Sequence, residues 1–169
     1  IASCLVGSEM CIRDRYLDKD NNEVFLNYTT DKEEANGQHV LIIPIYNDKL
    51  LFTQHDIRGI EFPGGKIEQN ETSKDAAERE LNEETGAVAT ELHYIAQYYV
   101  ARQNLPSFYK DVYVAHIDYL ENKGDYLETN GPKLYRKVTD IPEQQQSFLI
   151  KDTAILKCLE RVIELGYYK

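Results

Sequence analysis

The chain has 169 residues and a mass of 19.6 kDa, which predicts one domain with a core that buries roughly two thirds of the unfolded surface. Its composition, 42% hydrophobic and 28% charged, is ordinary for a globular protein, and no apolar run approaches the ~20 residues of a membrane-spanning helix. The net charge of −10 argues against general nucleic-acid binding and stable duplex DNA binding, because phosphate backbones are held by dense Lys and Arg patches.

The first fifteen residues have the character of a segment outside the folded domain. They begin without Met, show no helix or strand periodicity, and lack the basic and apolar regions of a secretion signal. We expect residues 1–15 to be non-native sequence or a disordered leader, and residues 16–169 to form the single domain. Without that segment Cys158 is the only cysteine, and a chain that cannot form an internal disulfide fits a reducing cytoplasm.

The first half of the domain is predicted to be a set of strands. They are expected at residues 24–27, 39–46, 50–54 and 60–62. The second is a continuous apolar run typical of a buried strand, and a turn at Asn47-Asp48 joins it to its hairpin partner. A polar loop is expected at 29–38, and the breaker cluster Pro63-Gly64-Gly65 ends the set.

The second half combines helices and strands. A helix is predicted from a cap at Thr72 or Ser73 to Glu84, with Gly86 where a helix should stop. Strands follow at 92–101, 108–120 and 133–138, the second with one buried face, and an amphipathic helix at 152–165. This order predicts one α/β (α+β) domain with a mixed sheet between helices.

Three glutamates of the predicted first helix share one face, because Glu80, Glu83 and Glu84 stand three and four residues apart. Their repulsion costs roughly 0.2–0.5 kcal/mol per pair, and the helix dipole disfavours negative charge in the last turn. A divalent cation such as Mg²⁺ would reverse both penalties and let an acidic protein hold a polyphosphate. The alternative is a solvated acidic face on which Arg79 pairs with Glu83.

The residues around this face follow a fixed spacing. The pattern runs through Gly65, Glu71, Arg79-Glu80-Leu81, Glu83-Glu84 and Gly86, separated by five, seven, one and one residues. With each residue type at a frequency of roughly 5–7%, the seven fixed residues that follow Gly65 would all match by chance on the order of once in 10⁸ starting points. The spacing resembles the signature of Nudix hydrolases and departs from it only at Ala87, where a larger aliphatic residue is usual.

The resemblance implies a Nudix α/β/α sandwich. It implies that Glu80, Glu83 and Glu84 are the catalytic residues and bind Mg²⁺ or Mn²⁺, with the carbonyl of Gly65 as a further metal ligand. Such an ion neutralises charge on a phosphoanhydride and lowers the pKa of a bound water. Either Glu80 or a carboxylate outside the motif is the candidate general base.

The same resemblance assigns structural roles to other motif residues. Arg79 and Glu71 would pair to brace the loop before the helix, and Gly86 would end the helix. The glycines allow the backbone to approach a metal closely.

Segments outside the motif resemble the YtkD-like branch of the family. They are residues 58–66, 94–98, 126–132 and 147–152. Members of that branch are described as nucleoside triphosphate diphosphatases, with 8-oxo-dGTP or dGTP as substrate, and as RNA 5′ pyrophosphohydrolases. The resemblance therefore implies Mg²⁺-dependent cleavage of a phosphoanhydride in a nucleoside triphosphate or at a triphosphorylated RNA 5′ end. The alternatives are an ADP-ribose or nucleotide-sugar hydrolase, and a non-catalytic nucleotide-binding module.

Charged residues near the motif are candidates for substrate binding. Arg58 and Lys66 flank the glycine bend and could hold phosphate, or each could be a solvated charge at a strand edge. Glu128, or one of Glu121 and Asp125, could add a fourth carboxylate; the alternative is a solvated loop.

A basic group and two aromatic pairs could bind nucleic acid, or could have no role in binding. A small basic group at Lys133, Arg136 and Lys137 could touch an RNA backbone, or could simply be solvated. The aromatic pairs at 98–99 and 108–109 could stack on a base, although strand alternation places one residue of each pair in the core. The four histidines lack metal-ligand spacing.

Overall fold

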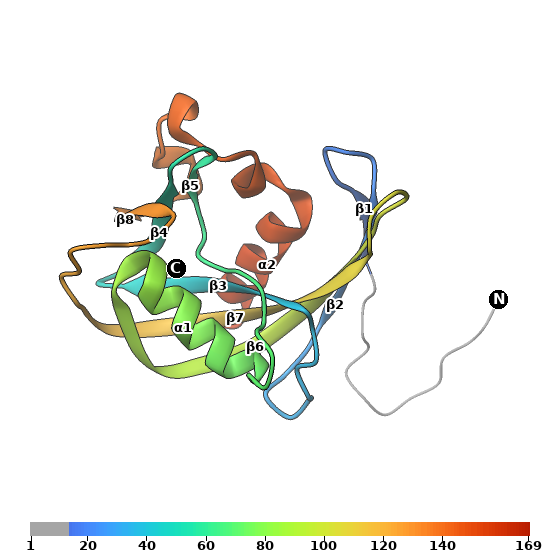
Figure 1. Cartoon of the computed structure of the whole chain (residues 1–169), viewed down its shortest axis with the longest axis horizontal. Helices are drawn as coiled ribbons and strands as arrows, with labels where there is room; N and C mark the ends of the chain where they lie inside the picture. The colour runs from blue at the N-terminus through green and yellow to red at the C-terminus, as the bar shows by residue number, and fades with distance from the viewer. Residues whose placement is uncertain (1–13) are drawn as a thin grey trace.

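The structure, a computed structural model, describes residues 14–169 (Figure 1). The expected leader lies outside the described residues, except that Asp14 and Arg15 belong to the first strand instead, because they pair with Leu26 and Phe25. The strands are β1 Asp14–Leu17, β2 Glu23–Tyr28, β3 His39–Tyr46, β4 Lys49–His55, β5 Gly59–Glu61, β6 Ala87–Ala101, β7 Phe108–Leu120 and β8 Thr129–Tyr135. The helices are α1 Ser73–Thr85 and α2 Thr153–Glu164, with short 3-10 helices η1 Val138–Asp140, η2 Glu143–Gln145 and η3 Phe148–Lys151.

One mixed sheet organises the chain. Its strands follow the order β1-β2-β6-β7-β3-β4-β5, and β8 pairs with β4 beside β5. The pairing of β3 with β7 is parallel, and the other pairings are antiparallel. Asn47 and Asp48, both with positive φ, form the tight turn between β3 and β4, as the sequence predicts.

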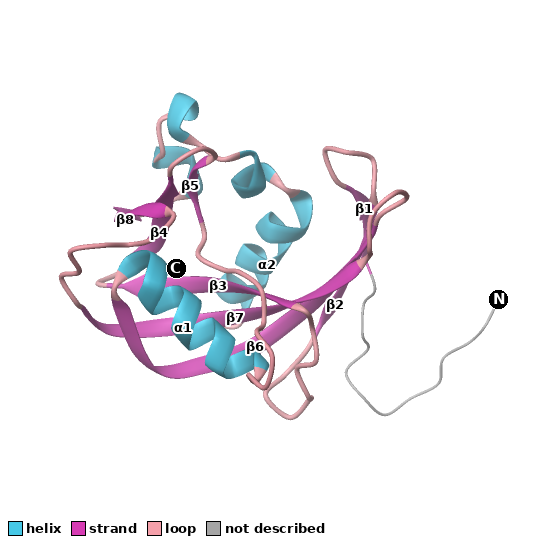
Figure 2. Cartoon of the chain, in the orientation of Figure 1, coloured by secondary structure: helices cyan, strands magenta, loops and turns pink. Residues whose placement is uncertain are grey.

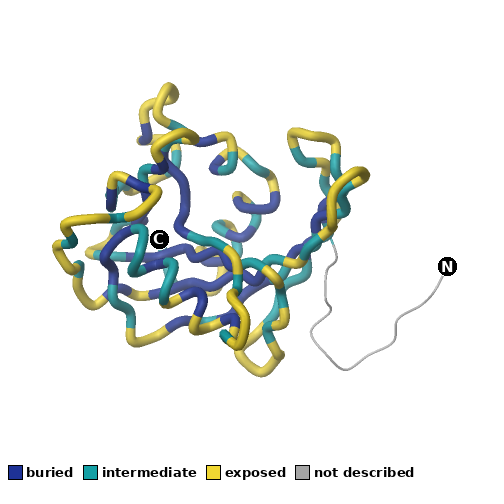
Figure 3. The backbone as a smooth tube through the Cα atoms, viewed as in Figure 1, coloured by how far each residue is buried: buried dark blue, intermediate teal, exposed yellow. Residues whose placement is uncertain are grey.

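The central strands are buried on both faces, because a helix covers each side of the sheet (Figures 1 and 2). On β3, Val40 and Ile42 pack with α1, whereas Leu41 and Ile43 pack with α2. This arrangement explains the unbroken apolar run of that strand and confirms the expected sandwich. Figure 3 shows the result as a continuous buried band through the centre of the sheet.

Three expectations about strands are wrong in detail. β7 is buried on both faces over residues 111–115 rather than on one, because α1 and α2 both lie over it. β6 begins five residues early, at Ala87, because its first residues pair with the end of β7. The last strand covers 129–135 rather than 133–138, since pairing with β4 sets its register. Strand pairing and the helices packed on the sheet, which the local pattern does not contain, decide all three.

The first helix begins and ends as its sequence indicates. Thr72 is the N-cap: its side chain accepts from the amide of Asp75, whose carboxylate accepts from the amide of Thr72 in return. Gly86, at φ 70°, ends the helix in the left-handed conformation and donates to the carbonyl of Asn82. Buried Ala76, Ala77 and Leu81 attach α1 to the sheet, so its opposite face is free to carry charge.

α2 packs on the other face through Ala154, Ile155, Cys158 and Val162. Cys158 is buried with a free thiol. Among residues 14–169, no helix is long and apolar enough to cross a membrane.

Thr72→Ala should lower the free energy of unfolding by about 1 kcal/mol, because it leaves helix amides without a capping acceptor. Urea unfolding followed by circular dichroism measures the change. Thr139→Ala, at an exposed threonine of η1, is the matched control. Equal stability of the two variants would contradict a capping role for Thr72.

Candidate active site

The glutamate face of α1 opens onto a cavity of about 790 Å³. Glu80, Glu83 and Glu84 line one wall, and Gly64 and Gly65 of the loop after β5 line the floor beside them. The other walls come from β3, β5, β7, the loop before β8 and the segment from η3 to α2. Elements distant in sequence therefore meet at the face that the motif predicts.

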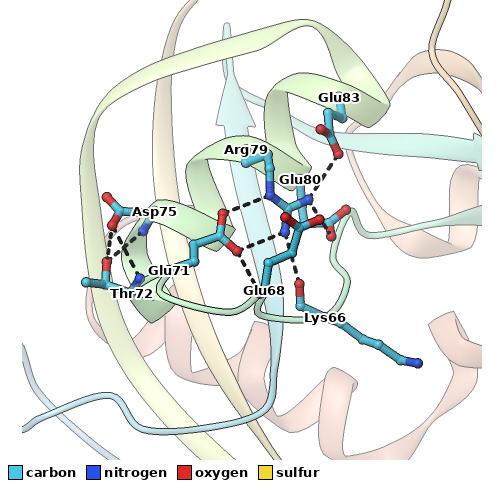
Figure 4. Close-up of polar contacts among 8 residues, drawn as sticks. All are labelled: Lys66, Glu68, Glu71, Thr72, Asp75, Arg79, Glu80 and Glu83. Carbon is cyan, nitrogen blue, oxygen red and sulfur yellow. Dashed lines mark hydrogen bonds and ion pairs between the residues drawn. The ribbon is translucent and has the colours of Figure 1, made fainter.

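Arg79 is the centre of the polar network (Figure 4). Its guanidinium donates to both carboxylate oxygens of Glu71, at 2.8 and 3.1 Å, and to the carbonyl of Lys66 at 3.0 Å. A third nitrogen donates to Glu80 at 2.9 Å and to Glu83 at 3.1 Å. One cation thus ties the loop to the helix and holds two glutamates of the cavity wall.

The pairing of Arg79 with Glu83 is the contact expected of a solvated acidic face, but most of this face is shielded from solvent. The side chains of Arg79 and Glu80 are only 24% and 14% exposed. Hydrogen bonds from Arg79 to Glu71 and Glu80 raise the pKa of the guanidinium, so it stays charged. A largely desolvated cation among three carboxylates is a built site rather than a surface salt bridge.

The two deeper glutamates are held in an environment that resists their ionisation. Burial raises the pKa of Glu84 to about 8, although the amide of Gly64 donates to its carboxylate at 3.2 Å. Burial also raises the pKa of Glu80, against the opposing effect of Arg79. A positive charge in the cavity would relieve this cost, because an adjacent opposite charge favours the ionised carboxylate.

Gly65 lies where a larger residue would not fit, because an added Cβ would overlap the carboxylate of Glu80. The Gly65 carbonyl accepts from the amide of Val40 at 2.8 Å, which fixes this oxygen against β3 and leaves it one further lone pair. Gly64 is similarly close to β3, since its Cβ would collide with the carbonyl of Val40. These contacts are a physical reason for two consecutive glycines.

The donor set suits a hard divalent cation, since it consists of carboxylate and carbonyl oxygens around one cavity. Within residues 14–169, no three Asp, Glu, His or Cys side chains are gathered closely enough to hold an ion. Arg79 holds Glu80 and Glu83, while Glu84 turns to the amide of Gly64. The oxygens of this cavity are of the type that such an ion prefers.

The wall opposite α1 carries a second ion pair. Arg58 donates to both oxygens of Glu61, the shortest contact being 2.6 Å, and Glu61 also accepts from the hydroxyl of Ser147 at 2.7 Å. Glu61 and Ser147 are buried. Arg58 is therefore held at the cavity wall by a carboxylate that is itself anchored to the segment before η3.

Two cavity residues were missed by sequence reasoning, Lys110 and His39. Lys110 stands next to Asp111 in a strand that is otherwise mostly apolar. Two adjacent charges on opposite faces of such a strand are the sequence feature that could have indicated a functional role. Burial lowers the pKa of Lys110, and its amine lies 5.9 Å from the ring centroid of Tyr98. Burial lowers the pKa of His39 to about 4, and the charges of Lys110, Lys66 and Arg102 act in the same direction.

The remaining candidates separate into two sets. Arg58, Lys66 and Glu128 line the cavity, although the amine of Lys66 points away from the glutamates (Figure 4). Glu121 and Asp125 do not line the cavity. Glu121 accepts a hydrogen bond from Asn82, and Asp125 accepts one from the amide of Leu127.

The basic group at 133–137 and the two aromatic pairs lie away from this cavity's lining. Within the pairs, Tyr98 is buried and Tyr109 is exposed, as strand alternation predicts. Tyr99 and Tyr109 instead contact each other, with ring centroids 4.6 Å apart.

Together the sandwich, the glycine loop and the braced glutamate helix define a hydrolase of phosphoanhydrides. The NUDIX domain model matches residues 35–134, more than half of the chain, and the protein belongs to the Nudix family. The match begins before β3 and ends in β8, so it contains the loop and helix of the site.

Two relatives support the YtkD-like branch. YtkD of Bacillus subtilis (strain 168), named as an 8-oxo-dGTP diphosphatase, is 36% identical over 148 residues, covering 86% of this chain and 93% of YtkD. The crystal structure of the B. subtilis pyrophosphohydrolase BsRppH superposes with a TM-score of 0.83 at 35% identity, covering 92% of this chain and 99% of BsRppH.

A more distant structure shares the fold alone. It is an ADP-ribose pyrophosphatase from Streptococcus suis 89-1591, with a TM-score of 0.55 and 19% identity, covering 80% of this chain and 97% of its own.

His39 should make the protein less stable in acid. Its folded pKa of about 4 lies below the ordinary 6.5, so the unfolded chain takes up this proton first. Stability from this group is therefore lost as pH falls from 6.5 towards 4. Urea unfolding between pH 7 and 4.5 should show a shallower loss for His39→Gln than for the wild type. Parallel curves would show that His39 is not responsible.

Proposed function

We propose that the protein is a Mg²⁺- or Mn²⁺-dependent pyrophosphohydrolase that cleaves a phosphoanhydride in a nucleoside triphosphate or at a triphosphorylated RNA 5′ end. The observation that carries the proposal is the composition of one cavity. It combines the three motif glutamates with three cations of its lining, Arg58, Lys66 and Lys110. A polyphosphate needs both features, oxygen ligands for a metal and cations for the phosphates that the metal does not neutralise.

Glu80, Glu83 and Glu84 would hold the metal together with the carbonyl of Gly65. When bound, the ion supplies charge neutralisation on the phosphate oxygens and a lowered pKa for water. Arg79 is a positioning residue, because it touches Glu71, Glu80 and Glu83 rather than the substrate. Its fork-shaped guanidinium fixes the glutamates and the loop relative to each other.

The residues outside the motif would bind and orient the substrate. Arg58, in the turn before β5, and Lys110 of β7 line the cavity and would contact phosphate oxygens. Glu61 is engaged by Arg58 and Ser147 and holds Arg58 at the cavity wall. Glu80, or the cavity carboxylate Glu128 outside the motif, would accept the proton of the attacking water.

The relatives favour the substrate class. YtkD is named for 8-oxo-dGTP and BsRppH as a pyrophosphohydrolase, and both are at least 35% identical over most of this chain. The ADP-ribose pyrophosphatase shares only the fold at 19% identity. Triphosphates are therefore the first substrates to test, and ADP-ribose is the comparison.

Glu80→Gln should keep the fold and lower turnover by at least about a hundredfold, because it removes one oxygen charge from the reacting face. Release of phosphate and pyrophosphate is measured with triphosphorylated RNA, 8-oxo-dGTP, dGTP and ADP-ribose at equal concentration. Glu78→Gln, at an exposed glutamate of the same helix, should behave as wild type. Wild-type turnover by Glu80→Gln would refute the catalytic assignment, and fastest hydrolysis of ADP-ribose would refute the substrate class.

Metal binding should be visible without any substrate. Mg²⁺ that binds only the folded state raises its stability, by about 2.7 kcal/mol at a hundred times the dissociation constant. Thermal unfolding with increasing MgCl₂ should therefore shift upward in the wild type and in Glu78→Gln, and much less in Glu83→Gln. An equal shift in all three proteins would place the ion elsewhere.

A further inference from the structure

The third glutamate of the motif is held differently from the other two. Arg79 donates to Glu80 and Glu83, whereas the carboxylate of Glu84 accepts from the amide of Gly64 at 3.2 Å. Glu84 also lies in the last turn of α1, where the backbone carbonyls have no partner within the helix. The position of Glu84 therefore depends on the contacts that fix this end of the helix.

Two buried hydroxyls meet the carbonyl of Glu84. Thr53 of β4 donates to this oxygen at 3.2 Å, and Thr129, the first residue of β8, donates to it at 3.0 Å. A carbonyl oxygen has two lone pairs, so it can accept both bonds. Thr53 is 0% exposed and Thr129 is 6% exposed, so bulk water would not replace a lost hydroxyl. In Figure 1 the end of α1 lies beside β4 and β8.

The hydroxyl of Thr129 has a single proton to donate, and a second carbonyl lies close to it. The carbonyl of Tyr126 is 3.1 Å from this hydroxyl, but it already accepts from the amide of Thr129 at 3.2 Å. The hydroxyl itself accepts from the amide of Gly131 at 3.3 Å. The backbone around Thr129 thus orients this side chain and leaves its proton for Glu84.

Thr53 connects Glu84 to the glycine loop on the floor of the cavity. In the pairing of β4 with β5, Thr53 lies opposite Glu61, and Gly64 follows Glu61 by three residues. The amide of Gly64 then returns to the carboxylate of Glu84. These contacts close a ring, because Thr53 holds the main chain of Glu84 and the loop after β5 holds its side chain.

We propose that Thr53 and Thr129 are positioning residues for the metal site, because their hydroxyls fix the main chain of Glu84 where its carboxylate faces the glycine loop. The inference rests on the proposed function, in which Glu84 is a metal ligand. Neither threonine lines the cavity, so both act through Glu84 and not on the substrate. They do for Glu84 what Arg79 does for the other two glutamates.

The first experiment measures Mn²⁺ binding without substrate, by electron paramagnetic resonance. Thr53→Val combined with Thr129→Val keeps the shape of both side chains and removes both donors. Affinity should fall on the order of tenfold, because groups that orient metal ligands contribute roughly 10–100-fold. Each single valine variant should show a smaller loss, since one hydroxyl still serves the carbonyl, and the single variants test the proposal even if the double variant fails to fold. Thr53→Ser combined with Thr129→Ser keeps both donors and should bind Mn²⁺ as the wild type does.

Val162→Ala is the control for a general loss of stability, because Val162 is buried in the core under α2, on the other face of the sheet from α1. Thermal unfolding should shift downward in this variant and in the double valine variant. Only the double valine variant should bind Mn²⁺ more weakly. Equal weakening in both, or unchanged binding in the single and double valine variants, would overturn the positioning role.

The metal dependence of hydrolysis gives a second test, with the fastest triphosphate substrate. The double valine variant should need on the order of tenfold more Mg²⁺ for its half-maximal rate. Its KM for the triphosphate at saturating Mg²⁺ should stay at the wild-type value, because neither threonine contacts the substrate. A raised KM with an unchanged Mg²⁺ dependence would overturn the proposal.

Glu83→Gln separates this proposal from the proposed function. If Glu83→Gln binds Mn²⁺ as tightly as the wild type, the motif glutamates do not hold the metal and both proposals fail. If Glu83→Gln weakens binding and the valine variants do not, the metal site stands and the role of the two threonines is refuted.

Discussion

The site depends on one guanidinium that is held between a loop and a helix. Arg79 contacts Glu71, Glu80, Glu83 and the carbonyl of Lys66 at once, with its side chain only 24% exposed. Removing any carboxylate leaves part of a desolvated cation unpaired, and removing the cation leaves three acids in mutual repulsion. Lysine could not replace it, because a single ammonium lacks the planar fork that reaches two sides. The spacing of Glu71, Glu80 and Glu83 about Arg79 is therefore the spacing that this side chain requires.

The sheet allows the charged face to exist. Ala76, Ala77 and Leu81 bury one side of α1 in the same layer as Val40 and Ile42 of β3, and this apolar contact places the helix. α2 closes the other face of the sheet through a separate set of side chains. The glutamates can then accumulate on the remaining side of α1, since their repulsion is a small term beside the burial of the opposite face.

Net charge is a poor guide to what this surface binds. The protein carries −10 overall, yet the lining of the cavity holds Arg58 and Lys110. Burial lowers the pKa of His39, and the charges of Lys110, Lys66 and Arg102 act in the same direction, because protonation would add another charge beside them. An anionic substrate meets this local field at contact distance, since the Debye length of about 8 Å screens the charges on the far side of the protein.

The sequence alone determined the sandwich, the glutamate helix with its Thr72 cap and Gly86 end, the family and the branch. The helix, its ends and the family rest on local spacing, because helical periodicity, capping chemistry and the fixed motif are complete within about twenty residues. The sandwich and the branch rest on the order of the elements and on the resemblance of segments spread along the chain. The tertiary structure decided which charges join the site. Lys110 and His39 enter the cavity, Glu121 and Asp125 do not, and β1 adds a hairpin that no periodicity predicts. Strand register and two-sided packing place these side chains, and both depend on partners far away in the chain.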